Sequence, residues 1–163
     1  MRLPVRLPVA LAAGIIAVAI NSAALAIGDS FGVTTAHGGL LRLLVVATLG
    51  AVQPPAGPIF AFCFHTAIGL LMAVVYGVWL ERRLPGPVWV KGLVYAAVVY
   101  AANAFVVQPL LDEGVAGSAT LTGVGMVWFA FAHTLFFLVL AFAYAHLSPP
   151  TIRRPTRATR EMP

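Results

Sequence analysis

Apolar residues run along this chain in four long stretches without a charged side chain, at residues 7–28, 43–80, 92–111 and 114–152. A helix needs about 20 apolar residues, at about 1.5 Å each, to cross a hydrocarbon core of ~30 Å. Each stretch supplies one such helix, and we place the four spans at residues 5–27, 59–80, 88–111 and 122–146. The pattern predicts an all-α integral membrane protein with a single polytopic domain over residues 1–147.

Composition agrees with this class. The chain is 61% hydrophobic and only 9% charged, with a mean hydropathy of +0.96, whereas a soluble domain has about 25% charged residues. The single cysteine, Cys63, excludes an internal disulfide and a cysteine-based zinc cluster. The net charge of +5 does not indicate nucleic-acid binding, because the basic residues flank the apolar spans as topology determinants do. The predicted partner is the lipid bilayer.

The charges also predict an orientation. Positive charge accumulates on the cytoplasmic side of membrane proteins. With both termini in the cytoplasm, nine basic residues lie on that side: Arg2, Arg6, Arg82, Arg83, Lys91, Arg153, Arg154, Arg157 and Arg160. The outer side then holds Asp29, Asp112, Glu113 and one basic residue, Arg42. We therefore expect a multi-pass protein of the bacterial inner (plasma) membrane, and residues 148–163, rich in Pro and Arg, should form a disordered cytoplasmic tail.

Two segments need separate interpretation. Residues 37–52 are apolar but short and interrupted by Arg42, so we expect an interfacial or re-entrant helix on the outer face, with Arg42 reaching the headgroups. The N-terminal segment, ending in SAALA at Ala26, is also similar to a secretory signal peptide, whose removal would leave three spans. Its uncharged run is long enough to span the membrane, which favours retention, and both alternatives stay open.

A polar pattern occurs twice. FHTAIGLLMAVVYG (residues 64–77) and AHTLFFLVLAFAYA (residues 132–145) each begin with His-Thr, at His65-Thr66 and His133-Thr134. A tyrosine follows each histidine after eleven residues, as Tyr76 and Tyr144. Asn21 and Asn103 are the corresponding polar residues of the first and third spans. The repetition predicts four transmembrane helices arranged as two tandem, similar helix pairs.

Polar groups inside a membrane need partners and usually face the bundle interior, and two interpretations of these residues compete. In the first, His65, His133, Asn21 and Asn103 form interhelical hydrogen bonds, and Thr66 and Thr134 bond backbone carbonyls one turn back. In the second, His65 and His133 form a site, either as ligands of a b-type haem or a divalent metal or, with Tyr76 and Tyr144, as a permeation or proton path. No resident cofactor is predicted on the first interpretation.

The sequence lacks HExxH, GxSxG and phosphate-binding loop motifs, so we do not expect an enzyme. The predicted function is a small transport or channel-like unit, or an accessory subunit of a membrane complex. The alternative is a haem- or metal-binding electron-transfer protein using His65 and His133. The exposed apolar faces of so small a bundle predict a homo-oligomer or a larger membrane complex.

The pattern H-T-x-x-G-x-x-x-A-x-x-Y-G, from His65 to Gly77, with its altered copy in the fourth span, resembles small bacterial inner-membrane proteins of the YagU-like type. The resemblance covers about two spans. It implies a four-helix inner-membrane protein of unassigned activity.

Overall fold

The computed structural model describes residues 3–35, 39–55 and 57–149, and these ranges contain helices but no strand. α1 (Leu3–Ser30) and α7 (Gly123–Leu147) are long α-helices. α3 (Pro58–Val75) continues through a π-helical turn, η1 (Tyr76–Leu80), into α4 (Glu81–Arg83). α5 (Val88–Ala102) likewise continues through η2 (Asn103–Val107) into α6 (Gln108–Leu110). Two short elements complete the fold, α2 (Gly39–Ala47) and a 3₁₀ turn, η3 (Val115–Gly117).

Four of these helical stretches are long and apolar enough to cross a membrane, with mean hydropathies of 1.7 to 2.2. They run over Arg6–Ser30, Pro58–Arg83, Val88–Leu110 and Gly123–Leu147. The predicted all-helical class and the four spans are thereby confirmed, because every predicted boundary falls within about three residues of a helix end. The chain has the architecture of a helical membrane protein.

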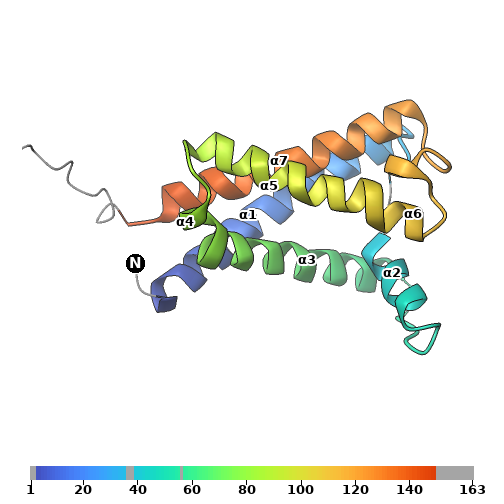
Figure 1. Ribbon diagram of the computed structural model, residues 1–163, viewed down its shortest axis with the longest axis horizontal. Coiled ribbons are helices and arrows are strands. Elements are labelled where there is room, and N and C mark those ends of the chain that lie inside the picture. Colours follow the sequence, from blue (N-terminus) through green and yellow to red (C-terminus); the bar gives the residue numbers. More distant parts are fainter. Residues whose placement is uncertain (1–2, 36–38, 56, 150–163) are drawn as a thin grey trace, which may run out of the picture.

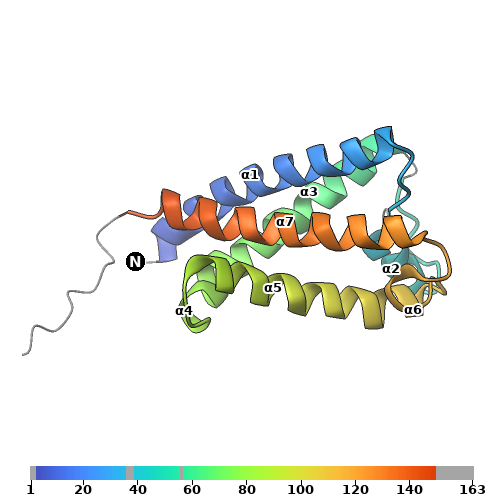
Figure 2. The ribbon, with the colours of Figure 1, turned by 90° about the horizontal axis from the view of Figure 1, so that it is seen from above.

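The long helices run alternately in opposite directions. Figure 2 shows α1, α7 and α5 side by side in one layer, and Figure 1 shows α3 on one face of that layer. α7 packs closely against both α1 and α5, while α3 packs against α1. One end of the bundle, here called the terminal end, carries the start of α1, α4 and the end of α7; the opposite end, the α2 end, carries α2, α6 and η3 (Figure 1).

Small residues allow α1 and α3 to approach closely. A Cβ added at Gly14 would lie 2.7 Å from the Cβ of Ala73, and one added at Gly77 would lie 2.7 Å from the Cβ of Ala10. Close packing of small residues is a main source of helix association where no hydrophobic effect operates between helices. The contact surfaces are built from Ala10, Ala13, Gly14 and Ala17 on α1, from Gly69 and Ala73 on α3, and from Gly77 on η1.

α3 and α5 are related differently. Their backbones do not pack closely, and the link between them is a side chain: the Tyr95 hydroxyl on α5 donates to the carbonyl oxygen of Met72 on α3 at 3.2 Å. A two-fold axis that exchanges the pair α1–α3 with the pair α5–α7 would pack α3 against α5 as closely as α1 packs against α7. The tandem repeat therefore stays a prediction. The predicted C-terminal tail, residues 148–163, lies almost wholly outside the described residues.

α2 occupies the segment expected to be an interfacial or re-entrant helix, although residues 36–38 lie outside the described ranges. Its arginine takes part in an ion pair. Arg42 pairs with the Glu113 carboxylate and its Nη2 lies 3.5 Å from the Leu111 carbonyl oxygen. Glu113 is only 5% exposed, so it is not a solvated loop acid. The ion pair fastens α2 to the loop that follows α6.

Removing Arg42 should cost more stability than removing the charge of Glu113. Arg42→Gln leaves a buried carboxylate without its counter-charge and is expected to lower the free energy of unfolding by about 1–3 kcal/mol. Glu113→Gln removes the buried charge itself and should cost less. Thermal unfolding in detergent measures both. The neighbouring Asp112 is exposed, so Asp112→Asn is the control, and equal losses for the Arg42 and Glu113 variants would contradict the prediction.

Candidate functional site: a polar cavity near the α2 end

The described part of the chain contains a partly open cavity of about 380 Å³ in the half of the bundle nearest α2. It lies between α3 and the layer of α1, α7 and α5, and Gly39, Leu40 and Leu41 of α2 contribute to its wall. Most of the wall is apolar, but five amide or imidazole side chains reach it from all four spans: Asn21, His65, Asn103, Gln108 and His133. A concave apolar site with a few convergent polar groups is the usual form of a small-molecule site.

Asn21 and His65 meet across the α1–α3 contact. The amide nitrogen of Asn21 lies 3.2 Å from Nε2 of His65, so the imidazole accepts at Nε2 when its proton is on Nδ1. Asn21 is 6% exposed, and its carbonyl oxygen Oδ1 has no hydrogen-bond partner. This contact is the interhelical kind that the sequence predicted.

His133 is held by its own helix. Its Nδ1 lies 3.3 Å from the carbonyl oxygen of Phe129, one turn earlier, and its ring contacts the Phe129 ring edge-to-face at 4.3 Å. The Tyr100 ring on α5 lies 6.1 Å away. His133 thus makes an intrahelical rather than an interhelical polar contact. With Nδ1 occupied, Nε2 is the ring nitrogen that is suited to meet a ligand.

Gln108 is the polar wall residue that sequence reasoning missed. It is 1% exposed, and neither its amide nitrogen nor its amide oxygen has a partner. It follows Asn103 by five residues, a spacing that separates side chains on a regular α-helix. The π-helical turn η2 between them lengthens that turn, and both residues reach the same cavity. No α-helical pattern in the sequence signals this.

The two predicted threonines do not line the cavity. Thr134 donates to the Ala130 carbonyl at 2.8 Å, as expected of a threonine inside an apolar helix. The hydroxyl oxygen of Thr66 is buried without a hydrogen-bond partner. The His-Thr pairs therefore separate in space, because the histidines face the cavity while the threonines turn away from it.

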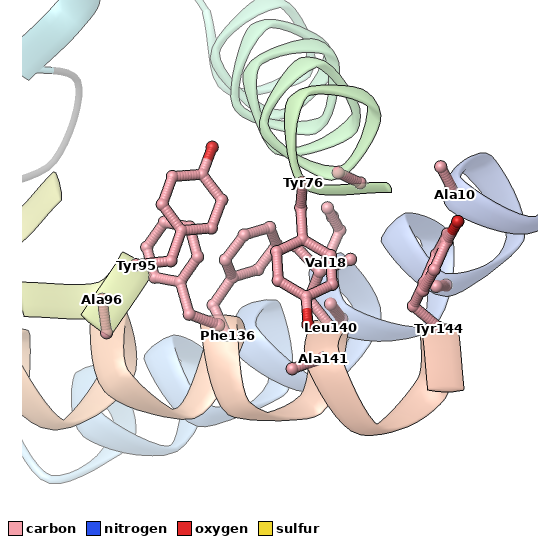
Figure 3. Packing of buried hydrophobic residues seen from close by; sticks show 13 residues of the cluster. Ala10, Val18, Tyr76, Tyr95, Ala96, Phe136, Leu140, Ala141 and Tyr144 are labelled. Atoms are coloured by element: carbon pink, nitrogen blue, oxygen red, sulfur yellow. The ribbon is translucent and has the colours of Figure 1, made fainter. Parts of the chain in front are cut away.

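Tyr76 and Tyr144 lie in a cluster nearer the terminal end (Figure 3). The Tyr76 ring stacks on Tyr95 at 6.0 Å and meets Tyr144 edge-on at 5.7 Å. Leu140 is fully buried beside them. We call these four residues the tyrosine plug, since they fill the bundle interior where the cavity ends. Eleven residues place each tyrosine about 16 Å from its histidine along the helix axis, and only the histidines line the cavity.

The plug is tied to the backbone at Gly77. The Tyr144 hydroxyl donates to the Gly77 carbonyl at 3.0 Å, and Arg6 Nη1 lies 3.3 Å from the same oxygen. Gly77 belongs to the π-helical turn η1. Arg6 is only 4% exposed, so this predicted topology residue is part of the packed interior. Three helices converge on one carbonyl oxygen at the terminal end.

The cavity offers limited support for a metal or haem. His65 and His133 both line it, but no group of three or more His, Cys, Asp or Glu side chains comes together within the described ranges. A porphyrin on His65 would need space beside Gly69, which follows it by one helical turn. A Cβ there would instead lie 2.5 Å from Val18 and 3.5 Å from Phe136, so α1 and α7 fill that space. The two imidazoles alone remain as candidate ligands.

No protein-family model matches the chain, and neither the curated proteins nor the solved structures contain a significant match.

Proposed function

We propose that this protein is a small transport unit of the bacterial inner membrane, whose substrate site is the polar cavity. The observation that carries the proposal is the convergence of polar side chains from all four spans on one cavity that ends at the tyrosine plug. Ionisable and amide groups are costly in a bilayer and typically mark substrate pathways. A binding site that opens toward one end and is closed at the other is the arrangement that alternating access requires.

The charges support an orientation. Arg6, Arg82, Arg83 and Lys91 belong to the terminal end, whereas Asp29, Asp112 and Glu113 belong to the α2 end. By the positive-inside rule, the terminal end faces the cytoplasm and α2 lies on the outer face as an interfacial helix. The cavity then lies in the outer half of the membrane and the plug in the cytoplasmic half. The four spans act as two similar helix pairs, and self-association covers part of their exposed apolar surface.

Thiol labelling tests the proposed pathway. Cys63 is the single cysteine, so Cys63→Ser gives a background for cysteines at chosen depths. Ile68 lines the cavity, and Leu140 lies in the plug. We expect a membrane-impermeant methanethiosulfonate, added outside intact cells, to label Ile68→Cys at least about tenfold faster than Leu140→Cys, because only the first is reached by water.

The matched control is Leu71→Cys, which lies on the same helix but is 55% exposed on its surface. In the membrane that surface faces lipid, and slow labelling is expected. Labelling of Ile68→Cys no faster than Leu140→Cys or Leu71→Cys would rule out a water-accessible cavity and the proposed pathway with it.

The electron-transfer alternative is kept because both histidines line one cavity. An oxidised-minus-reduced visible spectrum of the purified protein, with elemental analysis, separates the two functions. Haem bands or stoichiometric metal that vanish in His65→Ala or His133→Ala would favour electron transfer or metal transport. Their absence would leave transport of another substrate.

A further inference from the structure

α2 forms part of the cavity wall, at the end of the bundle where Figure 1 shows it beside the start of α3. Its first three residues, Gly39, Leu40 and Leu41, line the cavity. A Cβ added at Gly39 would lie 3.9 Å from Cγ1 of Val107 on η2 and 4.0 Å from Cδ1 of Leu111. Leu111 is only 5% exposed. α2 thus bounds the cavity and lies against Leu111, so its displacement would uncover both.

Few buried contacts hold α2 to the bundle. None of its nine residues is buried, and its backbone packs closely against η2 but not against α1 or α3. A segment with few buried contacts opens locally at a smaller free-energy cost than the packed core of a protein. The other walls of the cavity belong to the long helices, among which α1 packs closely against both α3 and α7. Displacement of α2 is therefore the least costly way to widen the cavity.

α2 can move without unfolding, because its last turn is closed by its own backbone. The Gly50 amide donates to the Val45 carbonyl at 2.9 Å, and the Leu49 amide donates to the Val46 carbonyl at 3.0 Å. Leu49 has a φ of 51°, the left-handed conformation that this type of helix cap requires. Residues 52–55, which lead toward α3, form no helix and are mostly exposed. α2 is thus a preformed unit on an irregular connection.

The ion pair of α2 favours its position at the cavity. The Arg42 side chain is 56% exposed, whereas the Glu113 side chain is 7% exposed. When α2 moves away, the guanidinium becomes hydrated, but the carboxylate stays buried without a counter-charge, which is costly. The movement also breaks the contact between Arg42 and the Leu111 carbonyl oxygen. The pair therefore acts as a latch between α2 and the loop that follows α6.

We infer that α2 is a lid on the cavity, held closed by the Arg42–Glu113 latch, and that substrate enters and leaves on this side when the lid lifts. The lid moves as a rigid helix, and the four spans keep their packing. This inference rests on the proposed function, since it describes how access to the same site is controlled.

Two single-cysteine reporters in the Cys63→Ser protein test the lid, in nanodiscs and with N-ethylmaleimide as the reagent. Leu111→Cys reports displacement of α2, and Ile68→Cys reports access to the cavity. We expect Arg42→Gln to speed alkylation of both reporters about tenfold, because the open state gains population when the latch is lost. Arg42→Lys keeps the positive charge and should keep most of the native protection.

Lys91→Gln is the matched control. It breaks a different ion pair, between Lys91 and Glu81 near the terminal end, and should leave both reporters unchanged. A third reporter, Leu140→Cys, lies in the tyrosine plug and detects general loosening of the bundle. If Arg42→Gln speeds alkylation of Leu140→Cys as much as that of Ile68→Cys, the ion pair serves overall stability and the lid is overturned.

A disulfide provides the opposite manipulation. Gly39→Cys and Val107→Cys bring two thiols close together, since a Cβ at Gly39 would lie 3.9 Å from the Val107 side chain. Oxidation should fix α2 in the closed position and remove the effect of Arg42→Gln on Ile68→Cys, and reduction should restore that effect. Mass spectrometry of the peptide that contains position 68 separates this cysteine from the other two. An effect that survives oxidation would show that α2 is not the lid.

The outcomes separate the two proposals. Alkylation of Ile68→Cys that is faster than that of Leu140→Cys, but unchanged by Arg42→Gln, would overturn the lid and leave the proposed pathway intact. Alkylation of Ile68→Cys no faster than that of Leu140→Cys in every variant would overturn the pathway and the lid together.

Discussion

Replacing Tyr76 by alanine is expected to lower the free energy of unfolding by about 3–5 kcal/mol, the range observed when a large buried aromatic side chain is truncated. Tyr76 is 1% exposed, and its ring contacts Tyr95 and Tyr144. Truncation leaves a void where three helices meet, and neighbouring side chains can fill it only in part. Thermal or denaturant unfolding in detergent measures the loss.

Two further variants define the cause. Tyr76→Phe keeps the ring and should cost far less than Tyr76→Ala. Phe105→Ala removes a comparable ring that is 66% exposed on the bundle surface, where no packed interior is lost. A loss for Phe105→Ala as large as that for Tyr76→Ala would contradict a structural role for the plug.

The same variant has a functional consequence. The cavity ends where the plug begins, so the void left by Tyr76→Ala adjoins the cavity and extends it toward the terminal end. A cysteine at Leu140, protected in the native protein, should then be alkylated faster. Tyr76 thus affects both the stability of the fold and the access of reagents to the plug, as expected where one packed side chain supports the fold and closes the end of the cavity.

The spans were predictable because composition alone decides them. A run of about 20 apolar residues has few stable states other than a helix across a membrane. The packing of the helices was harder to predict from the sequence, because these helices are apolar on all sides and have no single hydrophobic face to orient them. Small residues such as Ala13, Ala17 and Gly69 mark positions where another helix can approach closely, but not which helix it is. That α3 packs closely against α1 and not against α5 depends on tertiary geometry.

The candidate site was predictable to a similar degree. Asn21, His65, Asn103 and His133 stand out because polar side chains are rare in apolar runs, and the structure brings all four to one cavity. Gln108 lies beside a proline at the end of a span, where a polar residue is ordinary. Only the π-helical turn at Asn103–Val107 turns it inward. The pairing of Arg42 with Glu113 was not predictable, because it links segments 71 residues apart.

Gly77→Ala should be destabilising although alanine is the better helix former. An added methyl at Gly77 would lie 2.5 Å from Tyr144 Cε2 and 2.7 Å from the Cβ of Ala10. Ala10 Cβ is fixed to its backbone, so α1 and α3 must separate, and overpacking of this kind costs about 1–3 kcal/mol. The gain in helix propensity is only about 0.5–1 kcal/mol. The net change should be a loss of stability, measured by thermal unfolding in detergent.

Gly123→Ala is the matched control, since nothing lies within 4 Å of a Cβ added there. Its first-turn position in α7 gives the propensity gain without the overlap, so its stability should be unchanged or slightly higher. The two substitutions are chemically identical, and opposite signs would assign the loss at Gly77 to helix contact alone. Equal effects would mean that α1 and α3 do not meet at Gly77.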